Sequence, residues 1–496
     1  MMHPVSPFSR RLFLGAVLSV AAGGALATPL ARSPRPAPRP AGAGRAASSE
    51  RLIARAGLSG KLCFAVADAR TGEMLEVHNP LLGLPPASVT KAVTTLYALE
   101  TLGAQHRFET RLIATGPLKG RTIQGDLVLV GGGDPTLDTD MLGDLALQVA
   151  AAGVSGVTGR FLYHSGPLPE LSGIDSEQPV HAGYNPAVSG LNLNFNRVHF
   201  EWQRAGTGYA VSMDARAMRY RPEVGTARIE VVQRAAPVYT YRANGGVDEW
   251  TVAQGALGKG GQRWLPVRRP GHYCADVFHT LARFHGVSLP RPVASDLPVP
   301  GFVLARHQSD PLSTILRDML KYSTNLTAET VGLSATMARG GDPVSLAASG
   351  RSMTEWLTER IGTHKARFVD HSGLGAASRL SPAEMVRILV TAGPEGPVAS
   401  LMKEIPMRDD QGRVVANHAV KVRAKTGTLN FVSTLAGYAT GHSGRELVFA
   451  IFSADEARRA ALTGDERERP PGGRAWLGRA RRLQRDLVDR WGTLYG

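Results

Sequence analysis

The middle of the chain, residues 110–262, differs in pattern from both of its flanks. Alternating apolar and polar residues recur through it, as in residues 125–130 and 227–232, and only residues 141–152 have the spacing of a helix. Such alternation is typical of half-buried strands. Helical patterns resume on the C-terminal side. We therefore expect an α+β protein in which a β-rich region interrupts a second domain.

The flanks contain the elements of an antiparallel sheet covered by helices. A hairpin is predicted at residues 61–67 and 74–78, and a meander at residues 420–426, 434–440 and 446–453. Helical spacing of apolar residues predicts helices over residues 88–102, 275–284, 311–320 and 476–491, with Asp310 as the cap of the third. The expected catalytic domain comprises residues 50–110 and 263–496, and the inserted region comprises residues 111–262.

The first 27 residues are typical of an export signal. Arg10 and Arg11 precede a short apolar stretch, residues 15–24, which ends in Ala25-Leu26-Ala27. The stretch is shorter than the roughly 20 residues that span a bilayer, which disfavours an anchor. The paired arginines indicate the twin-arginine route, with ordinary secretion as the alternative, and predict a periplasmic protein. Residues 28–49, rich in Pro, Ala and Arg, are expected to form an extended linker.

The net charge of the chain bears on the class of its binding partner. The net charge of +15 favours anionic surroundings. Because the chain is expected to be exported, cell-wall polymer or peripheral contact with a membrane fits better than nucleic acid.

Cys63 and Cys274 are far apart in the sequence, and Cys63 lies in an apolar strand pattern. Two separate buried thiols are expected, with a disulfide between them as the alternative.

Ser88 and Lys91 form the first motif with chemical potential. Ser88 opens the predicted helix 88–102, and Lys91 lies one turn further along the same face. A serine hydroxyl needs an adjacent base, and a lysine whose pKa is lowered by burial can serve. The pair is interpreted as nucleophile and general base. Alone, it would more often be a helix cap beside a solvated lysine.

Ser323 and Asn325 form a second motif, at the end of an amphipathic helix. A hydroxyl and an amide two positions apart on a non-helical connection can point the same way. Ser323 is then a candidate proton relay to a leaving amine, and Asn325 a partner for substrate amide or base lysine. A simple helix junction is the alternative.

The third motif lies in a predicted strand, residues 420–426, and its continuation. Lys425 and Gly427 share one face of this strand. The glycine allows a substrate backbone to approach, and the lysine offers positive charge to a carboxylate. Thr426 lies between them, and the backbone amide of Thr428 could join that of Ser88 in an oxyanion hole. An edge-strand lysine before a turn is the alternative.

Together the motifs predict an acyl-transfer site, and their order resembles that of the low-molecular-mass class C penicillin-binding proteins, the D-alanyl-D-alanine carboxypeptidase and endopeptidase family. The resemblance extends beyond the three motifs to the segments at residues 125–137, 184–192 and 370–374. It implies a transpeptidase/β-lactamase-like domain, with a central antiparallel sheet flanked by helices, and a β-rich insertion that is itself subdivided. It implies peptidoglycan stem peptides as substrates, β-lactams as covalent inhibitors and no metal or organic cofactor.

The sequence departs from the family pattern at several positions. Thr324 replaces the Asp or Asn often found in the second motif, and His371 replaces a usual glycine. Some members use an acidic residue of the insertion to bind the amino group of the stem-peptide diamino acid. The comparable stretch here, residues 161–165, has no acid.

Three rival functions remain at the level of sequence. A serine β-lactamase of class C would need a tyrosine at the position of Ser323, and here Tyr322 is offset by one. A catalytically silent peptidoglycan-binding scaffold has no need of a lysine beside a serine. An esterase has no need of Lys425. A carboxypeptidase, with or without endopeptidase action, is therefore the preferred interpretation.

Overall fold

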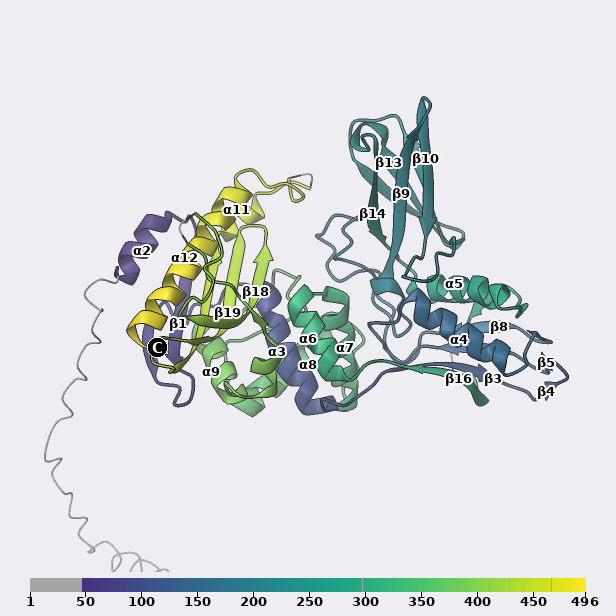
Figure 1. Ribbon diagram of the computed structural model, residues 1–496, viewed down its shortest axis with the longest axis horizontal. Helices are drawn as coiled ribbons and strands as arrows, with labels where there is room; N and C mark the ends of the chain where they lie inside the picture. The colour runs from purple at the N-terminus through teal and green to yellow at the C-terminus, as the bar shows by residue number, and fades with distance from the viewer. Residues whose placement is uncertain (1–46, 297, 410, 465) are drawn as a thin grey trace, which may run out of the picture. The chain divides into compact units, whose positions relative to one another are not determined.

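The computed structural model describes residues 47–496 apart from residues 297, 410 and 465 (Figure 1). The predicted export signal and most of the predicted linker lie outside the described residues. At the end of that linker, helix α2 (Ser49–Ala56) begins behind Ser48, whose side chain accepts a hydrogen bond from the Arg51 N–H. Within the described part of the chain, no helix is long and apolar enough to cross a membrane.

A six-stranded antiparallel sheet forms the centre of the interrupted domain. In spatial order its strands are β17 (Lys403–Glu404), β18 (Lys421–Leu429), β19 (Val432–Thr440), β20 (Glu446–Ala454), β1 (Lys61–Asp68) and β2 (Met74–His78). Strand β1 pairs with both β2 and β20, so the two flanks of the sequence share one sheet. This sheet contains the predicted hairpin and the predicted meander.

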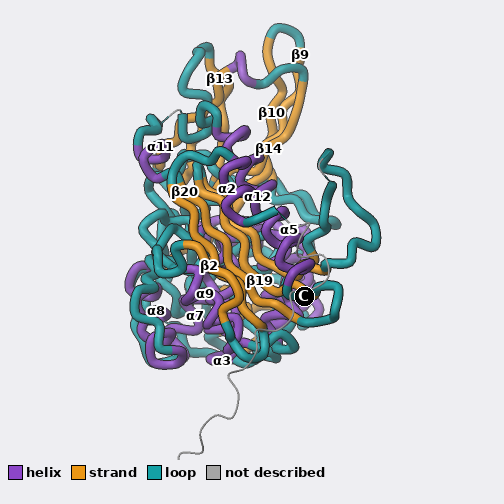
Figure 2. The backbone as a smooth tube through the Cα atoms, turned by 90° about the vertical axis from the view of Figure 1, so that its left-hand side faces the viewer, coloured by secondary structure: helices purple, strands orange, loops and turns teal. Residues whose placement is uncertain are grey.

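Alternation along β1 places its side chains in two different cores. Phe64 and Val66 pack with α2 and with the closing helix α12 (Gly473–Leu494). Cys63, Ala65 and Ala67 belong to the core on the opposite face. Figure 2 shows α2 and α12 on the near face of this sheet. Period-two alternation therefore builds a three-layer arrangement of helix, sheet and helix.

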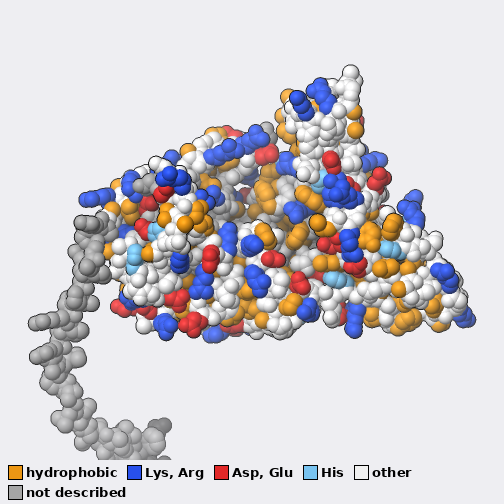
Figure 3. Space-filling model, viewed as in Figure 1, with side chains coloured by type: hydrophobic (Ala, Val, Ile, Leu, Met, Phe, Trp, Pro, Cys, Tyr) orange, Lys and Arg blue, Asp and Glu red, His pale blue; other side chains and the backbone are white. Residues whose placement is uncertain are grey.

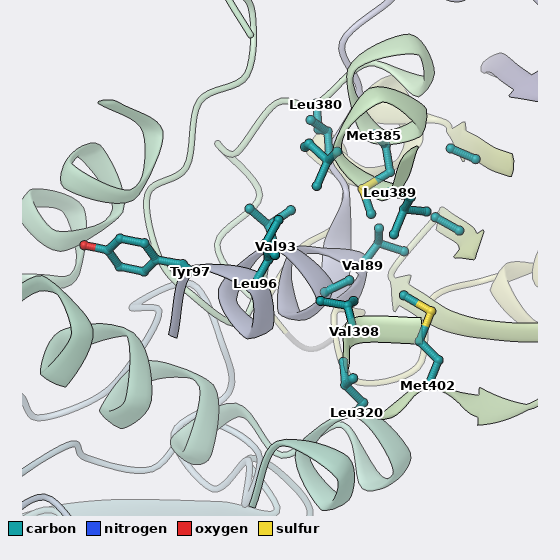
Figure 4. Close-up of a cluster of buried hydrophobic side chains, with 14 of the residues drawn as sticks. Val89, Val93, Leu96, Tyr97, Leu320, Leu380, Met385, Leu389, Val398 and Met402 are labelled. Atoms are coloured by element: carbon teal, nitrogen blue, oxygen red, sulfur yellow. The ribbon is translucent and has the colours of Figure 1, made fainter. Parts of the chain in front are cut away.

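The second face is covered by the helices that carry two of the motifs. Helix α3 (Thr90–Leu102) is largely buried and follows a 3₁₀ turn, η1 (Ala87–Val89). Around it lie α6 (Leu312–Tyr322), α7 (Asn325–Ala338), α8 (Leu346–Ile361), α9 (Pro382–Ala392) and α10 (Pro397–Leu401). Val89, Val93 and Leu96 lie among side chains of these elements (Figure 4). This packing fixes η1, and with it Ser88, against the sheet.

The inserted region is mainly β, as the sequence predicts, and contains one long helix in the expected place, α4 (Thr139–Ala151). Its largest sheet has five strands, β15 (Pro292–Ala294), β8 (Phe161–His164), β6 (Leu127–Val130), β3 (Glu109–Ala114) and β16 (Phe302–Gln308). Two three-stranded sheets consist of β9 (Arg197–Ala205), β10 (Gly208–Asp214) and β14 (Gly260–Pro266), and of β11 (Ala227–Val232), β12 (Tyr239–Asn244) and β13 (Val247–Ala253). A small sheet joins β4 (Leu118–Lys119), β5 (Thr122–Ile123) and β7 (Gly156–Val157).

The expected end of the insertion at residue 262 needs correction. That boundary falls inside β14, which pairs along its length with β9 of the insertion. Helix α5 (Pro270–Phe284) buries Tyr273 and Phe278 in the core of the insertion. Strand β16 pairs with β3. We therefore propose that the inserted region spans residues 109–308.

Local signals at other element ends behave in two ways. Helix α9 begins with a capping box that Ser381 and Glu384 form around Pro382. Helix α6 does not, because Pro311 occupies the cap position with no side-chain hydrogen bond, and the predicted cap Asp310 stands outside. Cys63 and Cys274 are both buried and free, as the preferred interpretation expected.

Candidate active site

Ser88 and Lys91 meet at the start of α3. The Lys91 Nζ donates a hydrogen bond of 3.1 Å to the Ser88 Oγ. Ser88 is half buried, in the 3₁₀ turn before α3, whereas Lys91 is fully buried. Burial lowers the pKa of Lys91 to about 8, against the opposing effect of Glu329 and Asp370. A buried lysine in contact with an accessible hydroxyl is the arrangement that activates a serine.

Two further acceptors fix the Lys91 amine. Its Nζ donates to Asn325 Oδ1 at 2.7 Å and to the Ser372 carbonyl at 2.8 Å. Asn325 is the first residue of α7, and its Nδ2 donates to the backbone carbonyl of Tyr184 in the insertion. The amide of Asn325 is thereby held at both ends. Of the two partners considered for Asn325, a substrate amide and the lysine of the first motif, the structure shows contact with Lys91.

Ser323 faces a different lysine. It is the C-cap of α6 in a left-handed conformation, with φ of 62°. Its Oγ accepts a hydrogen bond of 2.9 Å from Lys425 Nζ, which also donates to the Thr426 carbonyl at 2.8 Å. Burial lowers the pKa of Lys425 to about 6, and the positive charge of Lys91 adds to the effect. The second motif therefore bridges the two lysines, with Asn325 on Lys91 and Ser323 on Lys425.

Gly427 brings strand β18 close to Ser88. A Cβ atom at this position would lie 2.9 Å from the backbone nitrogen of Ser88 and 2.9 Å from the Pro86 carbonyl oxygen. Thr434 of β19 secures the same turn through a 2.7 Å hydrogen bond to that carbonyl. No side chain fits between the strand and η1. Thr428 follows Gly427 and is exposed at the edge of the cleft.

A cleft of about 1240 Å³ opens over these residues. Its floor includes Ser88, Ser323, Asn325 and Thr428, so the three motifs converge on one site. The insertion contributes Glu177, Gln178 and Tyr184, and the C-terminal segment contributes Arg459, Arg467, Arg469 and Arg474. Among the described residues, no group of His, Cys, Asp or Glu is placed to hold a metal ion.

Comparison with protein families decides the identity of this arrangement. The model of the D-Ala-D-Ala carboxypeptidase 3 (S13) family matches residues 47–468. The chain belongs to this family. It is therefore a peptidase, and the resemblance seen in the sequence is confirmed.

Curated relatives of this S13 peptidase are similar along most of their length. A carboxypeptidase of Mycobacterium tuberculosis is 28% identical over 450 residues, which cover 85% of this chain and 86% of the relative. A D-alanyl-D-alanine carboxypeptidase of an Actinomadura species is 28% identical over 434 residues, covering 80% and 78%. Both similarities include the inserted region as well as the catalytic flanks.

A solved structure shares the fold. Penicillin-binding protein 4 of Haemophilus influenzae superposes with a TM-score of 0.71 at 20% identity, covering 89% of this chain and 99% of the other. The same protein has been solved in complex with a β-lactam, and that structure superposes with a TM-score of 0.69. The expected α+β fold, a transpeptidase-like domain interrupted by a β-rich region, is thus confirmed.

Sequence reasoning missed two acids beneath Lys91. Glu329 is fully buried on α7, and Asp370 is 2% exposed in the loop after α8. Asp370 lies in a segment already associated with the family, but Glu329 was not singled out. A signal was present, because Glu329 stands four residues after Asn325 in an otherwise uncharged helix and so projects from the same face.

The departures from the S13 pattern are accommodated without reaching the reacting groups. The hydroxyl of Thr324 is bonded to that of Thr327, 2.9 Å away. The His371 ring is fully buried, and its Nε2 is 2.7 Å from the Ser349 Oγ. Burial lowers the pKa of His371 to about 3, so the ring is neutral. Gly332 of α7 makes room for this ring, because a Cβ there would lie 2.1 Å from the His371 Cγ.

The insertion contributes one acid to the lining of the cleft, outside residues 161–165. Residues 161–165 contain strand β8, which does not line the cleft. The acid that the insertion does bring to the cleft is Glu177, in the loop that also presents Tyr184. Its carboxylate lies 3.8 Å from the Arg467 guanidinium.

Proposed function

We propose that this S13 peptidase is a serine-type D-alanyl-D-alanine carboxypeptidase in which Ser88 is the nucleophile. The observation that carries the proposal is the 3.1 Å hydrogen bond between Ser88 Oγ and the fully buried amine of Lys91. A pKa near 8 leaves part of the Lys91 population neutral at neutral pH. A neutral amine that donates to Asn325 and to the Ser372 carbonyl keeps its lone pair for the serine proton.

Acylation then proceeds with a balanced proton transfer. Ser88 Oγ attacks the carbonyl carbon of the penultimate D-alanine while Lys91 Nζ takes the hydroxyl proton. The oxyanion is stabilised by the backbone N–H groups of Ser88 and Thr428. When the C–N bond breaks, the proton that Lys91 accepted passes by way of the Ser323 hydroxyl to the leaving amine of the terminal D-alanine, and Lys91 is neutral again. Water then attacks the ester of Ser88 while Lys91 accepts its proton, and this proton returns to Ser88 Oγ as the ester bond breaks.

The terminal carboxylate of the substrate is assigned to Lys425. The Lys425 amine is bonded to Ser323, so it lies beside the relay that protonates the leaving D-alanine. Thr426 and Gly427 continue the same strand, and the lack of a side chain at Gly427 lets β18 pack directly on the turn that carries Ser88. A cross-linked dimer lacks a carboxylate at this place, and its cleavage would add endopeptidase action.

Glu177 is the candidate for recognition of the stem-peptide diamino acid. It is exposed and lines the cleft from the side of the insertion. Its carboxylate is shared with Arg467, and an ammonium group of the substrate would compete for it. Family members that use an acid of the insertion for this purpose support the assignment, although in this chain the acid follows β8 by a longer loop.

The three rival functions are disfavoured by the placement of side chains. Tyr322, which a class C β-lactamase would need near the serine, is 65% exposed and stands beside Lys321 instead of in the cleft. A silent scaffold would have no physical reason to bury Lys91 and Lys425 beside two serine hydroxyls, because burying an amine costs free energy. An esterase would leave the buried Lys425 without a carboxylate to bind.

The test is the intact mass of the protein after incubation with benzylpenicillin. We expect a stable adduct on the parent chain and none on Ser88→Ala, because the β-lactam acylates the same serine as the substrate. An adduct on both proteins would remove Ser88 from its role. Rapid loss of the drug without an adduct would favour a β-lactamase, and neither adduct nor loss would favour the scaffold.

Export to the periplasm is the setting that this function requires. Peptidoglycan stem peptides lie outside the cytoplasmic membrane, and the paired arginines at residues 10–11 support delivery by the twin-arginine route. The basic net charge would favour contact with anionic polymer or, peripherally, with membrane. No role for a metal or organic cofactor is needed in any step above.

A further inference from the structure

Two buried carboxylates lie beneath the base, and no step of the reaction above uses them. Glu329 comes from α7 and Asp370 from the loop after α8. Together with Lys425 from β18, they are the charged groups that act on Lys91. A charge is expensive to bury unless it is paired and hydrogen bonded. The contacts of each carboxylate therefore indicate what it is there to hold.

Glu329 grips two consecutive backbone amides. Its Oε2 accepts the His371 N–H at 2.9 Å, and its Oε1 accepts the Ser372 N–H at 2.9 Å. The carbonyls of the same two residues face α3, where His371 O accepts from Thr94 Oγ1 at 2.7 Å and Ser372 O accepts from Lys91 Nζ at 2.8 Å. The dipeptide is thereby clamped between α7 and α3. Without Glu329, the N–H groups of His371 and Ser372 would lose their acceptor, and only the hydrogen bonds to α3 would hold the dipeptide.

Asp370 secures the remainder of this loop. Its carboxylate oxygens accept the N–H groups of Gly373, at 2.8 Å, and Gly375, at 2.7 Å. Gly373 has φ of +74°, and a Cβ there would lie 1.9 Å from the Ala87 carbonyl oxygen. The loop therefore packs directly on the turn that contains Ser88. Lys91 is placed between a fixed carbonyl on one side and the nucleophile on the other.

The direction of the Lys91 amine depends on this carbonyl. Three acceptors, Ser88 Oγ, Asn325 Oδ1 and Ser372 O, surround the Nζ. When Lys91 is neutral it has only two N–H bonds to donate. If Asn325 and Ser372 receive them, the lone pair points at Ser88. A displaced Ser372 carbonyl would leave one N–H free to turn toward the serine and would misdirect the base.

We propose that Glu329 is a positioning residue for acylation: it fixes the Ser372 carbonyl, and through it the Lys91 amine, while its carboxylate balances the buried charge of that amine. The inference rests on the proposed function, because it assumes that Lys91 is the base for Ser88. Burial and the nearby Asp370 raise the pKa of Glu329 to about 8, whereas the two N–H donors and the charge of Lys91 favour its carboxylate form. Its influence on Lys91 is therefore both geometric and electrostatic.

The test is the pH dependence of the second-order rate constant for acylation by benzylpenicillin, in the parent and in Glu329→Gln. In the parent, the rate should rise with pH through about 8, since the neutral amine is the active form and burial beside these carboxylates gives Lys91 a pKa of about 8. Glu329 and Lys91 titrate together over this pH range, and in Glu329→Gln only the amine remains. Without the charge that opposes the effect of burial, the pKa of Lys91 falls. The rising limb should move to lower pH. The plateau should fall at least tenfold, because a glutamine cannot accept both N–H groups.

Two further variants separate positioning from general destabilisation. Glu329→Asp keeps the charge but shortens the clamp, so it should lower the plateau while leaving the limb near its parental position. Glu384→Gln is the matched control. Glu384 also accepts consecutive backbone amides, those of His364, Lys365 and Ala366, but it caps α9 and contacts none of the reacting groups. It should lower the melting temperature without moving the limb.

Each outcome has a distinct meaning. If the pH of the rising limb and the plateau rate in Glu329→Gln equal those of the parent, the inference is overturned. Rates that fall in Glu329→Gln and Glu384→Gln alike, in step with melting temperature and with an unmoved limb, would also overturn it. If Glu329→Gln does not fold, the same decision rests on whether Glu329→Asp lowers the plateau more than Glu384→Gln does. A parent chain that benzylpenicillin does not acylate at any pH would count against the proposed function instead.

Discussion

Lys425 has to be charged in order to bind a carboxylate, but its surroundings disfavour that charge. Burial, with the help of Lys91 and Lys403, lowers the pKa of Lys425 to about 6. In the free enzyme above that pH, the amine is mostly neutral and bonded to Ser323 and the Thr426 carbonyl. A carboxylate placed beside it stabilises the charged form and raises the pKa again. Substrate binding above pH 6 should therefore take up a proton.

We expect calorimetry at about pH 7.5 to detect this uptake. Titration of Ser88→Ala with a peptide that ends in D-Ala-D-Ala, in buffers of different ionisation enthalpy, should show close to one proton bound per site. Adding Lys425→Ala should abolish the uptake and weaken binding roughly 10- to 100-fold, the worth of a charge-assisted hydrogen bond. For a cross-linked dimer, which has no free carboxylate at that place, Lys425→Ala should weaken binding less. Equal uptake with and without Lys425 would assign the proton to another group.

The residues that could be predicted from the sequence are those whose neighbours in the chain reveal them. Ser88 and Lys91 are one helical turn apart, and Lys425 and Gly427 share a strand face, so local geometry already brings each pair together. Glu329 and Glu177 act through contacts with distant segments. Their proposed roles depend on the tertiary positions of α7 and of a loop of the insertion, which no local sequence pattern specifies.

At the scale of elements, helix α7 and the loop at residues 370–375 are fitted to each other. His371 occupies space that a side chain at position 332 would need, and only glycine at that position leaves it free. The ring is held further by contact with the Ser349 hydroxyl and by stacking against Tyr97, with ring centroids 6.3 Å apart. Since the same loop carries the carbonyl that orients Lys91, this fit bears on the site.

We expect Gly332→Ala to destabilise the protein, although alanine ordinarily favours a helix. The added methyl overlaps the His371 ring, and overpacking of this kind costs about 1–3 kcal/mol. His371→Gly should also destabilise, by removing a packed ring. The double variant should be more stable than the sum of the two single effects predicts, because the clash is gone. Denaturant unfolding gives the free energy of unfolding of the parent, the two single variants and the double variant. If the losses of the two single variants add strictly in the double variant, Gly332 and His371 are not coupled by this contact.

The boundaries of elements and domains were harder to predict than their existence. The amphipathic pattern of α5 was recognised, but such a pattern does not say which sheet the helix covers, and α5 covers the insertion. Strand β14 was cut by the predicted boundary because its partner, β9, lies far earlier in the sequence. At α6, Asp310 suits a cap position, but the chain places Pro311 there instead.

At the scale of the whole molecule, the cleft carries more positive than negative side chains. Among the described residues that line it, five are arginines and three are glutamates: Arg379, Arg459, Arg467, Arg469, Arg474, Glu177, Glu456 and Glu468. Several of these are paired, as Arg379 is with Glu456 at 2.8 Å. Two of the arginines, Arg467 and Arg469, belong to the segment that joins α11 (Glu456–Ala460) to α12, where blue side chains are visible (Figure 3). The field over the cleft therefore favours an anionic substrate.

We expect kcat/KM for a stem peptide with several carboxylates to fall as salt is raised. Screening shortens the reach of these exposed charges from about 10 Å at 0.1 M to about 3 Å at 1 M, so a several-fold loss is expected over this range. An analogue whose carboxylates outside the scissile dipeptide are amidated serves as the control and should lose much less. The same salt dependence for both substrates would show that the cleft charge does not guide binding.

The position of β1 determines when during synthesis this enzyme can become active. Strand β1 is made early, but it pairs with β20, which is completed only at Ala454. The insertion, contiguous in sequence and with a core of its own, can fold while the sheet still lacks its later strands. Closing so long a loop adds only a modest entropic cost once the ends are present. Ser88 is therefore synthesised long before Lys425. A chain truncated ahead of β18 would contain the proposed nucleophile, the proposed base and a folded insertion, but it would lack a reactive site.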